Sequence, residues 1–444
     1  MKNNPFLQEA GNLLNQMREI RRDLHKHPEL GTQEVRTSRI VADYLTHLGL
    51  DVRTGIGGHG VVAMLSGKEA EKCVALRADM DALPMEEKNA VPYASARPGV
   101  AHCCGHDGHT AILLGTASLL CRFSDRLKGS VKFVFQPSED KAPGGAIPMI
   151  ADGTLKNPDV DGIFSLHLNP DLPEGTVGIK SGFGTISSAE FVLRMIGKGC
   201  HVASPHEGVD PVIMAAMVIM AGQTIVSRRK NPLDPAILSF CTVRGGTASN
   251  IIPEEVTLTG SIRALNPEKR EELANALDQV ARGVAQTSGG TCHLTVKREY
   301  PSVFNHPELA AEFKGSAAKI VPADSVIDMQ SPSMTGEDVA YFHQKVPGAH
   351  WLLGTANPAM GFTHPLHSPF FDFNEEAMAL GAAIQACCAV DFLSNRHKKP
   401  LSRFEGSTFK GSEVGSQRTE VRNQKTEIRR KRSVARNKKP VNSG

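Results

Sequence analysis

The first half of the chain alternates between short apolar segments and helical segments, and the apolar segments lead into acidic residues or histidine. This alternation limits the possible folds more than any other feature of the sequence. Residues 73–81, 131–140 and 162–170 each contain the pattern of a buried strand, and the second strand is expected to stop at Pro137. Residues 109–120, between the first two of these strands, have apolar residues at helical spacing. Strands that alternate with helices predict an α/β fold built on a sheet.

The pattern changes near residue 186. From there to residue 298, the order strand, helix, strand, strand, helix, strand predicts a compact α+β insert of the ferredoxin-like kind. The expected parts are a discontinuous α/β domain (1–185 and 299–395), an inserted domain (186–298) and a basic tail (396–444).

The composition is that of an ordinary globular protein. Of 444 residues, 40% are hydrophobic and 22% are charged, which excludes collagen-like, coiled-coil and wholly disordered classes. The N-terminus lacks the apolar core of a signal peptide, which predicts a cytoplasmic protein. The longest apolar run, residues 212–226, contains Gly222 and Gln223, so we expect no membrane span. Nine cysteines in a chain of this length do not suggest a disulfide framework.

Charge is unevenly distributed along the chain. Residues 396–444 contain 15 Lys and Arg against four Glu, a balance of +11, whereas the preceding residues contain 35 basic and 43 acidic residues, a balance of −8. We expect the tail to be disordered because it has few hydrophobic residues. A basic run can bind nucleic acid. Because the rest of the chain is acidic and the run has no interleaved aromatic residues, we expect at most an accessory contact.

The densest group of reactive side chains lies at residues 102–109, His-Cys-Cys-Gly-His-Asp-Gly-His. Three His and two Cys immediately before a helix suit a divalent metal. Two other interpretations stay open. The segment could be a buried polar turn, or a closed structural zinc site of two Cys and two His. Adjacent Cys103 and Cys104 rarely reach one ion together, which counts against the zinc site.

Further candidates lie where the other predicted strands end. Asp79, the pair Glu139 and Asp140, and His167 each follow or end an apolar segment. Ligands in α/β sheets collect at the carboxyl ends of strands, so we expect these side chains to share a site. One carboxylate of the pair could bind metal while the other moves protons. His364 and His367, near a later apolar segment, are weaker candidates.

The insert offers a candidate anion site. Asn250 lies thirteen residues before Arg263, and His201 and His206 lie in an earlier turn bounded by Gly and Pro. If Arg263 and Asn250 reach the same point, they suit a substrate carboxylate, because Arg presents two parallel donors. Arg263 could equally be a surface charge on a strand.

These segments together resemble one enzyme family, the metal-dependent amidohydrolases that include hippurate hydrolase, aminoacylases and glutamate carboxypeptidase. The match is to the hippurate-hydrolase branch and covers residues 15–393. It rests on these motifs: LHKHPELG (24–31), RADMDALP (77–84), HCCGHDGHT (102–110), FQPSED (135–140), SLHL (165–168), GKGCHVASPHEGVDP (197–211), GGTASNIIP (245–253), TGSIR (259–263) and HSPFFDFNEE (367–376).

The resemblance implies roles for individual residues. It implies that the following side chains are the protein ligands of a two-metal centre: Cys104, His106, Asp140, His167 and His367. It also implies that Cys104 bridges the ions in place of the Asp of related branches, with Glu139 as general base and Asp79 as supporting carboxylate. In the insert, it implies that His201 reaches the site of a partner subunit in a homodimer, and that Asn250 and Arg263 bind the substrate carboxylate.

The implied activity is hydrolysis of the amide bond of N-acyl amino acids of the hippurate or N-acetyl type. The implied fold is a zinc-peptidase-like catalytic domain with a mixed sheet and an inserted lid and dimerisation domain. The implied cofactors are two divalent ions, Mn or Zn, with Co or Ni as alternatives. A carboxypeptidase or dipeptidase of the same family is the alternative activity, and a non-catalytic metal-binding protein is the alternative class. The chain departs from the branch at Asp140 (usually Glu), Cys103 (usually Ala) and Cys200 (usually Gly).

Overall fold

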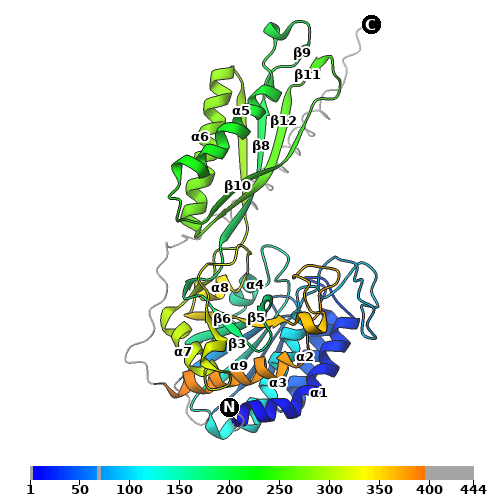
Figure 1. The fold of residues 1–444 in the computed structure, drawn as a ribbon, viewed down its shortest axis with the longest axis vertical. Helices are drawn as coiled ribbons and strands as arrows, with labels where there is room; N and C mark the ends of the chain where they lie inside the picture. Colours follow the sequence, from blue (N-terminus) through cyan, green and yellow to red (C-terminus); the bar gives the residue numbers. More distant parts are fainter. Residues whose placement is uncertain (1–3, 68–71, 396–444) are drawn as a thin grey trace, which may run out of the picture. The chain divides into compact units, whose positions relative to one another are not determined.

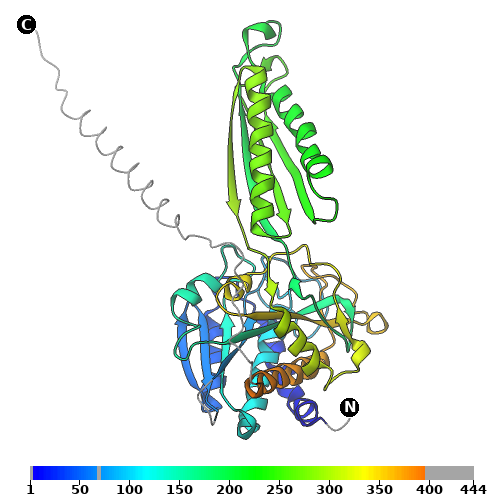
Figure 2. The same cartoon turned by 90° about the vertical axis from the view of Figure 1, so that its left-hand side faces the viewer.

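The computed structural model describes residues 4–67 and 72–395. Its main sheet has eight strands in the order β1-β2-β4-β3-β5-β16-β6-β15. Figure 1 labels β3, β5 and β6 of this sheet, and Figure 2 shows the same fold turned by 90°. In that order, the strands are Asp51–Ile56, Gly60–Leu65, Ser130–Gln136, Cys73–Asp79, Gly162–Pro173, Gly348–Ala356, Val177–Ile179 and Val326–Asp328. Parallel and antiparallel pairs both occur, so the sheet is mixed, as the sequence predicts. The predicted tail, with its disorder and basic charge, lies outside the described residues.

The four central strands β4, β3, β5 and β16 are parallel to one another. Their carboxyl ends therefore lie at one edge of the sheet, where Asp79 ends β3 and Glu139 follows β4 by three residues. The expectation that the strand with His167 ends at that residue is wrong. β5 continues to Pro173 because it keeps pairing with β16, where His167 lies opposite Leu352.

Helices cover both faces of this sheet. α1 (Pro5–Lys26), α3 (His106–Arg122) and α9 (Ala377–Ser394) pack against one another on one face, and α7 (Pro307–Ala317) packs against α9. The side chains of β3 alternate between the two faces of the sheet. Val74 and Leu76 join the core on that side, while Cys73 and Ala75 join a second core with α4 (Ala146–Ala151) and α8 (Ala340–His343). This part also contains α2 (Val35–His47).

Two helices in the described residues are long and apolar enough to cross a membrane, Pro211–Arg229 and Ala377–Ser394. The second is α9, and 78% of its apolar window is buried inside the protein. Its apolar character is thus explained by packing against α1 and α3. The first is only 33% buried, and it lies in the insert. Helices of this kind are common in the cores of soluble proteins, so they are weak indications of a membrane span.

Residues 187–298 form a second sheet with its own hydrophobic core. Its strands have the order β10-β12-β8-β13, and all neighbours are antiparallel. Along the chain, the elements are β8 (Ser187–Ile196), α5 (Pro211–Thr224), β10 (Ala236–Gly245), β12 (Glu255–Ala264), α6 (Pro267–Ser288) and β13 (Thr291–Arg298). This is the βαββαβ order of a ferredoxin-like unit. We propose to treat residues 186–298 as an inserted domain on this basis.

Candidate dinuclear metal site

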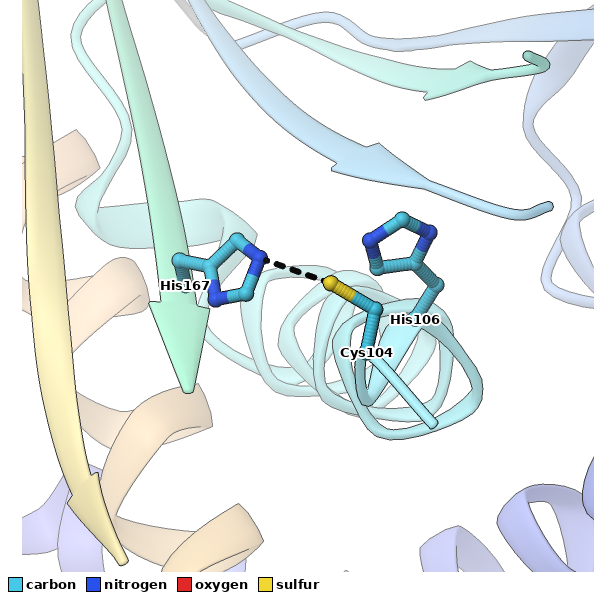
Figure 3. Close-up of side chains that lie close together, drawn as sticks. All are labelled: Cys104, His106 and His167. Carbon is cyan, nitrogen blue, oxygen red and sulfur yellow. Dashed lines mark hydrogen bonds between the residues drawn. The ribbon is translucent and has the colours of Figure 1, made fainter. Parts of the chain in front are cut away.

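Two groups of metal-ligand side chains share the thiol of Cys104. One consists of Cys104, His106 and His167, and the other of Cys104, Asp140 and His367. Within each group the ligand atoms lie within 4.8 Å of one another. His106 is the first residue of α3, Cys104 lies two residues before it, and His167 projects from β5 towards them (Figure 3). All five side chains that the family resemblance implies as ligands are therefore gathered in one place.

The hydrogen bonds of His106 and His167 determine which ring nitrogen faces the site. Nδ1 of His106 lies 2.9 Å from the carbonyl oxygen of Asp81, and Nδ1 of His167 lies 2.7 Å from the carbonyl oxygen of Leu168. A carbonyl can only accept, so each Nδ1 donates its proton there and Nε2 is the ring nitrogen that faces the site. Backbone carbonyls commonly hold metal-binding imidazoles in this way.

Uncommon backbone conformations occur at two positions around these groups. His367 has φ of 61°, and Ser138, just before Glu139, has φ of 58°. Residues other than glycine rarely adopt this left-handed region, and such residues cluster at functional sites. The N–H of His367 donates to the carbonyl of Cys103 at 2.8 Å, which fixes its position beside the thiol.

The arrangement fits divalent cations. Among the described residues, Nε2 of His106 and Oδ2 of Asp140 are buried without a hydrogen-bond partner. Burial and the Asp140 carboxylate raise the pKa of the Cys104 thiol well above its usual range. Burial alone would lower the pKa of His106, but the carboxylate of Asp79 and the sulfur of Cys104 raise it well above its usual range. A buried cluster this negative favours positive charge, and thiol, imidazole and carboxylate are ligands for Zn²⁺ and similar ions.

Glu139 lies beside these groups and is 4% exposed. Its Oε2 is 4.0 Å from Nε2 of His106. Burial, together with the carboxylates of Glu337 and Asp140, raises the pKa of Glu139 well above that of an ordinary Glu. Glu139 is close to the ligand atoms but belongs to neither of the two groups that share Cys104. A carboxylate in this position with a raised pKa is suited to moving protons.

Asp79 supports the site through His109. Oδ1 of Asp79 accepts Nδ1–H of His109 at 2.6 Å, and Nε2 of His109 accepts the backbone N–H of Leu168 at 2.9 Å. Both nitrogens of His109 are therefore occupied, although it belongs to the same sequence cluster as His106. Burial raises the pKa of Asp79, but His106 and Arg77 outweigh this effect and hold the pKa well below its usual range.

Asp81 is a further functional residue, one that was not among the candidates predicted from the sequence. Its Oδ1 accepts the N–H of Glu139 at 2.9 Å and its Oδ2 accepts the N–H of Asp140 at 3.0 Å. Asp81 thus organises both the candidate base and a candidate ligand, and its own carbonyl holds His106. Its position two residues beyond Asp79, where β3 ends, was a signal that could have found it.

The insert residues do not meet within one chain. His201 lies in β9 (Cys200–His201), opposite Ile251 in β11 (Ile251–Ile252), and Asn250 directly precedes β11. Arg263 lies near the other end of β12, so about 26 Å of strand separates it from Glu255 at the first end. Arg263 donates to the carbonyl of Met334. The expectation that Asn250 and Arg263 reach the same point therefore does not hold within one chain, because an extended strand keeps them apart.

The other candidate histidines have no place in the two groups. His102 is buried, and neither of its ring nitrogens has a hydrogen-bond partner among residues 4–67 and 72–395. His364 is exposed and contacts the ring of Phe370, and His206 lies in a short 3-10 turn.

A family model described as peptidase family M20/M25/M40 matches residues 75–391 of the chain. The chain belongs to this family. It is similar to the N-acetyl-L-cysteine deacetylase of Bacillus subtilis, with 38% identity over 359 residues that cover 81% of this chain and 84% of that protein. It is also similar to thermostable carboxypeptidase 1 of Saccharolobus solfataricus, with 37% identity over 377 residues that cover 84% of this chain and 94% of that protein.

The fold matches solved structures of the M20 family. The Bacillus subtilis YXEP protein, described as a dinuclear metal binding peptidase from this family, superposes with a TM-score of 0.76 and 32% identity. The match covers 86% of this chain and 99% of that chain. The chain is therefore an M20-family hydrolase with an α/β catalytic fold and candidate metal groups at the carboxyl edge of its sheet.

Proposed function

We propose that this M20-family hydrolase cleaves the amide bond of N-acyl amino acids of the hippurate or N-acetyl type. The observation that carries the proposal is the position of the buried Glu139 carboxylate beside two ligand groups that share Cys104. The similarity to an N-acetyl-L-cysteine deacetylase supports the choice of substrate class.

The two ligand groups would hold a pair of divalent ions, with Cys104 between them. Mn or Zn is proposed, and Co or Ni would also suit thiol, imidazole and carboxylate ligands. When bound, such ions supply Lewis acidity, which lowers the pKa of water and polarises a carbonyl. His106 and His167 would offer Nε2, since each uses its Nδ1 in a bond to a backbone carbonyl.

Glu139 would move the proton. Its carboxylate accepts a proton from water as the water attacks the amide carbon, and then delivers that proton to the leaving nitrogen. A raised pKa suits both steps because the group must be able to hold the proton between them. The exposed side chain of His367, 52% accessible, lies on the side from which substrate could enter.

A homodimer would bring the insert residues to the site. His201 and Asn250 are exposed, and together with Ile251 they lie around the β9 and β11 end of the insert. A hollow of about 660 Å³ is lined there by residues that include Cys200, His201 and Glu254. In this proposal, His201 and Asn250 of one subunit act at the site of the other, where His201 stabilises the oxyanion and the insert serves as a lid. Arg263 binds the substrate carboxylate from the same subunit as the metal groups.

A carboxypeptidase or dipeptidase activity is the alternative, supported by the similarity to thermostable carboxypeptidase 1. A non-catalytic metal-binding protein with a tail that contacts nucleic acid fits poorly, because Glu139 accompanies a complete ligand set. Cytoplasmic location stays a prediction.

A substrate panel on metal-reconstituted protein tests the proposal. N-acetyl and N-benzoyl amino acids, the same compounds with an amidated carboxyl group, and dipeptides with a free amino terminus are compared after loading with Mn, Zn, Co or Ni. Faster cleavage of acylated substrates with a free carboxylate supports the proposal. Preference for dipeptides favours the alternative, and no cleavage by any metal form rejects both.

A further inference from the structure

The turn that carries Glu139 and Asp140 begins at Ser138, whose φ of 58° is unfavourable for a residue with a side chain. Ser138 is 5% exposed, so water does not stabilise its backbone groups. Such a conformation persists only where the surroundings hold it.

Three consecutive N–H groups of this turn are held by carboxylates from elsewhere in the chain. Asp81 accepts the N–H groups of Glu139 and Asp140, and Oε1 of Glu34 accepts the N–H of Ser138 at 2.7 Å. On the opposite side of the turn, the hydroxyl of Tyr300 donates to the carbonyl of Glu139. Glu34 is the contact at the strained residue itself.

The side chain of Glu34 does not cap the helix that follows it. It occupies the residue before α2, but its side chain makes no hydrogen bond to the start of that helix. Glu29 does this instead, because its carboxylate accepts the N–H groups of Arg36 and Thr37 at 3.1 and 2.8 Å. Glu34 is nevertheless completely buried, which is costly for a carboxyl group. Its Oε1 accepts both the N–H of Ser138 and, at 3.4 Å, the Ser138 hydroxyl, whereas its Oε2 is buried without a hydrogen-bond partner among the described residues.

We propose that Glu34 is a positioning residue that holds the strained Ser138 and thereby directs Glu139 and Asp140 into the site. It touches neither the ligand groups nor substrate, and the effect on turnover rests on the proposed function. Burial and the neighbouring Asp81 carboxylate raise the pKa of Glu34 to about 7. An oxygen of either protonation form can accept the N–H of Ser138, so an amide of the same shape should replace it.

The close approach of Gly31 belongs to the same arrangement. A Cβ at Gly31 would lie 3.2 Å from Cα of Ser138 and 3.3 Å from Oδ2 of Asp81. Substitution of Gly31 by Ala should therefore push on the turn without changing any of its hydrogen-bonding groups.

The test compares Glu34→Ala, Glu34→Gln and Gly31→Ala in the full chain. Glu29→Ala is the control, because it removes a neighbouring carboxylate that accepts the N–H groups of Arg36 and Thr37 instead of that of Ser138. Co(II) titration followed by visible absorption reports metal affinity and ligand geometry without substrate, and kcat and KM are measured with an N-acetyl amino acid. Circular dichroism verifies that each variant is folded.

Removing a residue that holds a metal ligand in place through hydrogen bonds usually costs about 10- to 100-fold in metal affinity or activity. We expect a loss of that size in Co(II) affinity and kcat for Glu34→Ala, with KM little changed. Glu34→Gln should restore most of both, and Glu29→Ala should affect stability alone. Gly31→Ala should weaken Co(II) binding even if Glu34→Ala fails to fold.

Unchanged Co(II) affinity and spectrum in Glu34→Ala, or in Gly31→Ala if the former does not fold, would overturn the proposal. A Glu34→Gln variant as impaired as Glu34→Ala would also overturn it. If the wild-type chain cleaves no amide, the proposed function fails, but a loss of Co(II) affinity that Gln rescues would still support the positioning role.

Discussion

Sγ of Cys104 lies 3.3 Å from Nε2 of His367, a residue 263 positions further along the chain. The same sulfur lies 3.6 Å from Nε2 of His167. One thiol therefore joins two candidate ligand groups that the chain assembles from separate elements. The account of this protein as a two-metal hydrolase depends on that relationship.

Replacing Glu139 by Gln should abolish most activity while leaving metal binding intact. The amide keeps the shape of the side chain but cannot accept the proton from water, and general base catalysis contributes about 10²- to 10⁴-fold. We expect kcat to fall within that range at unchanged metal content, measured by elemental analysis of the same samples. Near wild-type turnover in a metal-loaded variant would remove Glu139 from the proposed role.

Replacing Asp79 by Asn should weaken metal binding although Asp79 belongs to neither of the groups that share Cys104. The change weakens the charged hydrogen bond from His109 to residue 79. His109 in turn accepts the N–H of Leu168, the residue next to His167. We expect a loss of about 10- to 100-fold in metal affinity, measured by competition with a chelator. Asp161→Asn, at the other end of β3 where Asp161 accepts the N–H of Cys73, is the matched control and should leave metal affinity unchanged.

Replacing Arg263 by Ala should mainly raise KM for substrates with a free carboxylate. A hydrogen bond to a charged group is worth about 1.5–3 kcal/mol, which corresponds to roughly a 10- to 100-fold change. The amidated substrate should lose far less, and Arg244→Ala, an exposed arginine on the neighbouring strand β10, should behave as wild type. Equal losses on charged and amidated substrates would contradict the assigned role.

Stability should fall as pH rises from neutral to alkaline values because of His25. Burial and Arg21 lower its pKa, but Asp107 and Glu87 outweigh them and raise it from 6.5 to about 9. A raised histidine pKa stabilises the fold fully below pH 6.5, and this contribution is lost as pH rises through 9. It amounts to about 3 kcal/mol in the free energy of unfolding.

Urea unfolding at pH 6 and pH 10 tests the His25 prediction. The stability difference between wild type and His25→Gln should be larger at pH 6 than at pH 10. A difference that does not change with pH would mean that His25 is not charged in the folded protein.

The sequence predicted much of the site because strand ends in a parallel sheet must lie at one edge. That rule gathered Asp79, Glu139 and Asp140 without any knowledge of contacts. It could not show that His109 is occupied by Asp79 and Leu168 while His106 keeps a free nitrogen, because residue spacing does not reveal which hydrogen bonds form. Motif resemblance, rather than spacing, singled out Cys104 and His367.

The hydrogen bonds through which Asp81 and Glu34 act could not be predicted from the sequence, for a related reason. Each acts through the backbone N–H groups of residues 138–140, at separations of 58 to 104 positions. The separation of Asn250 from Arg263 likewise follows from β12 being a single extended strand. Their spacing of thirteen residues was compatible with a turn that brings them together.

Metal stoichiometry tests the central claim most directly. The purified full chain and its Cys104→Ser variant are loaded with Zn or Mn, freed of excess metal by gel filtration and measured by elemental analysis, with Cys121→Ser as the control. The account predicts two ions per chain in wild type and Cys121→Ser, and one or fewer in Cys104→Ser. Two ions retained by Cys104→Ser, or fewer than two in loaded wild type, would contradict it.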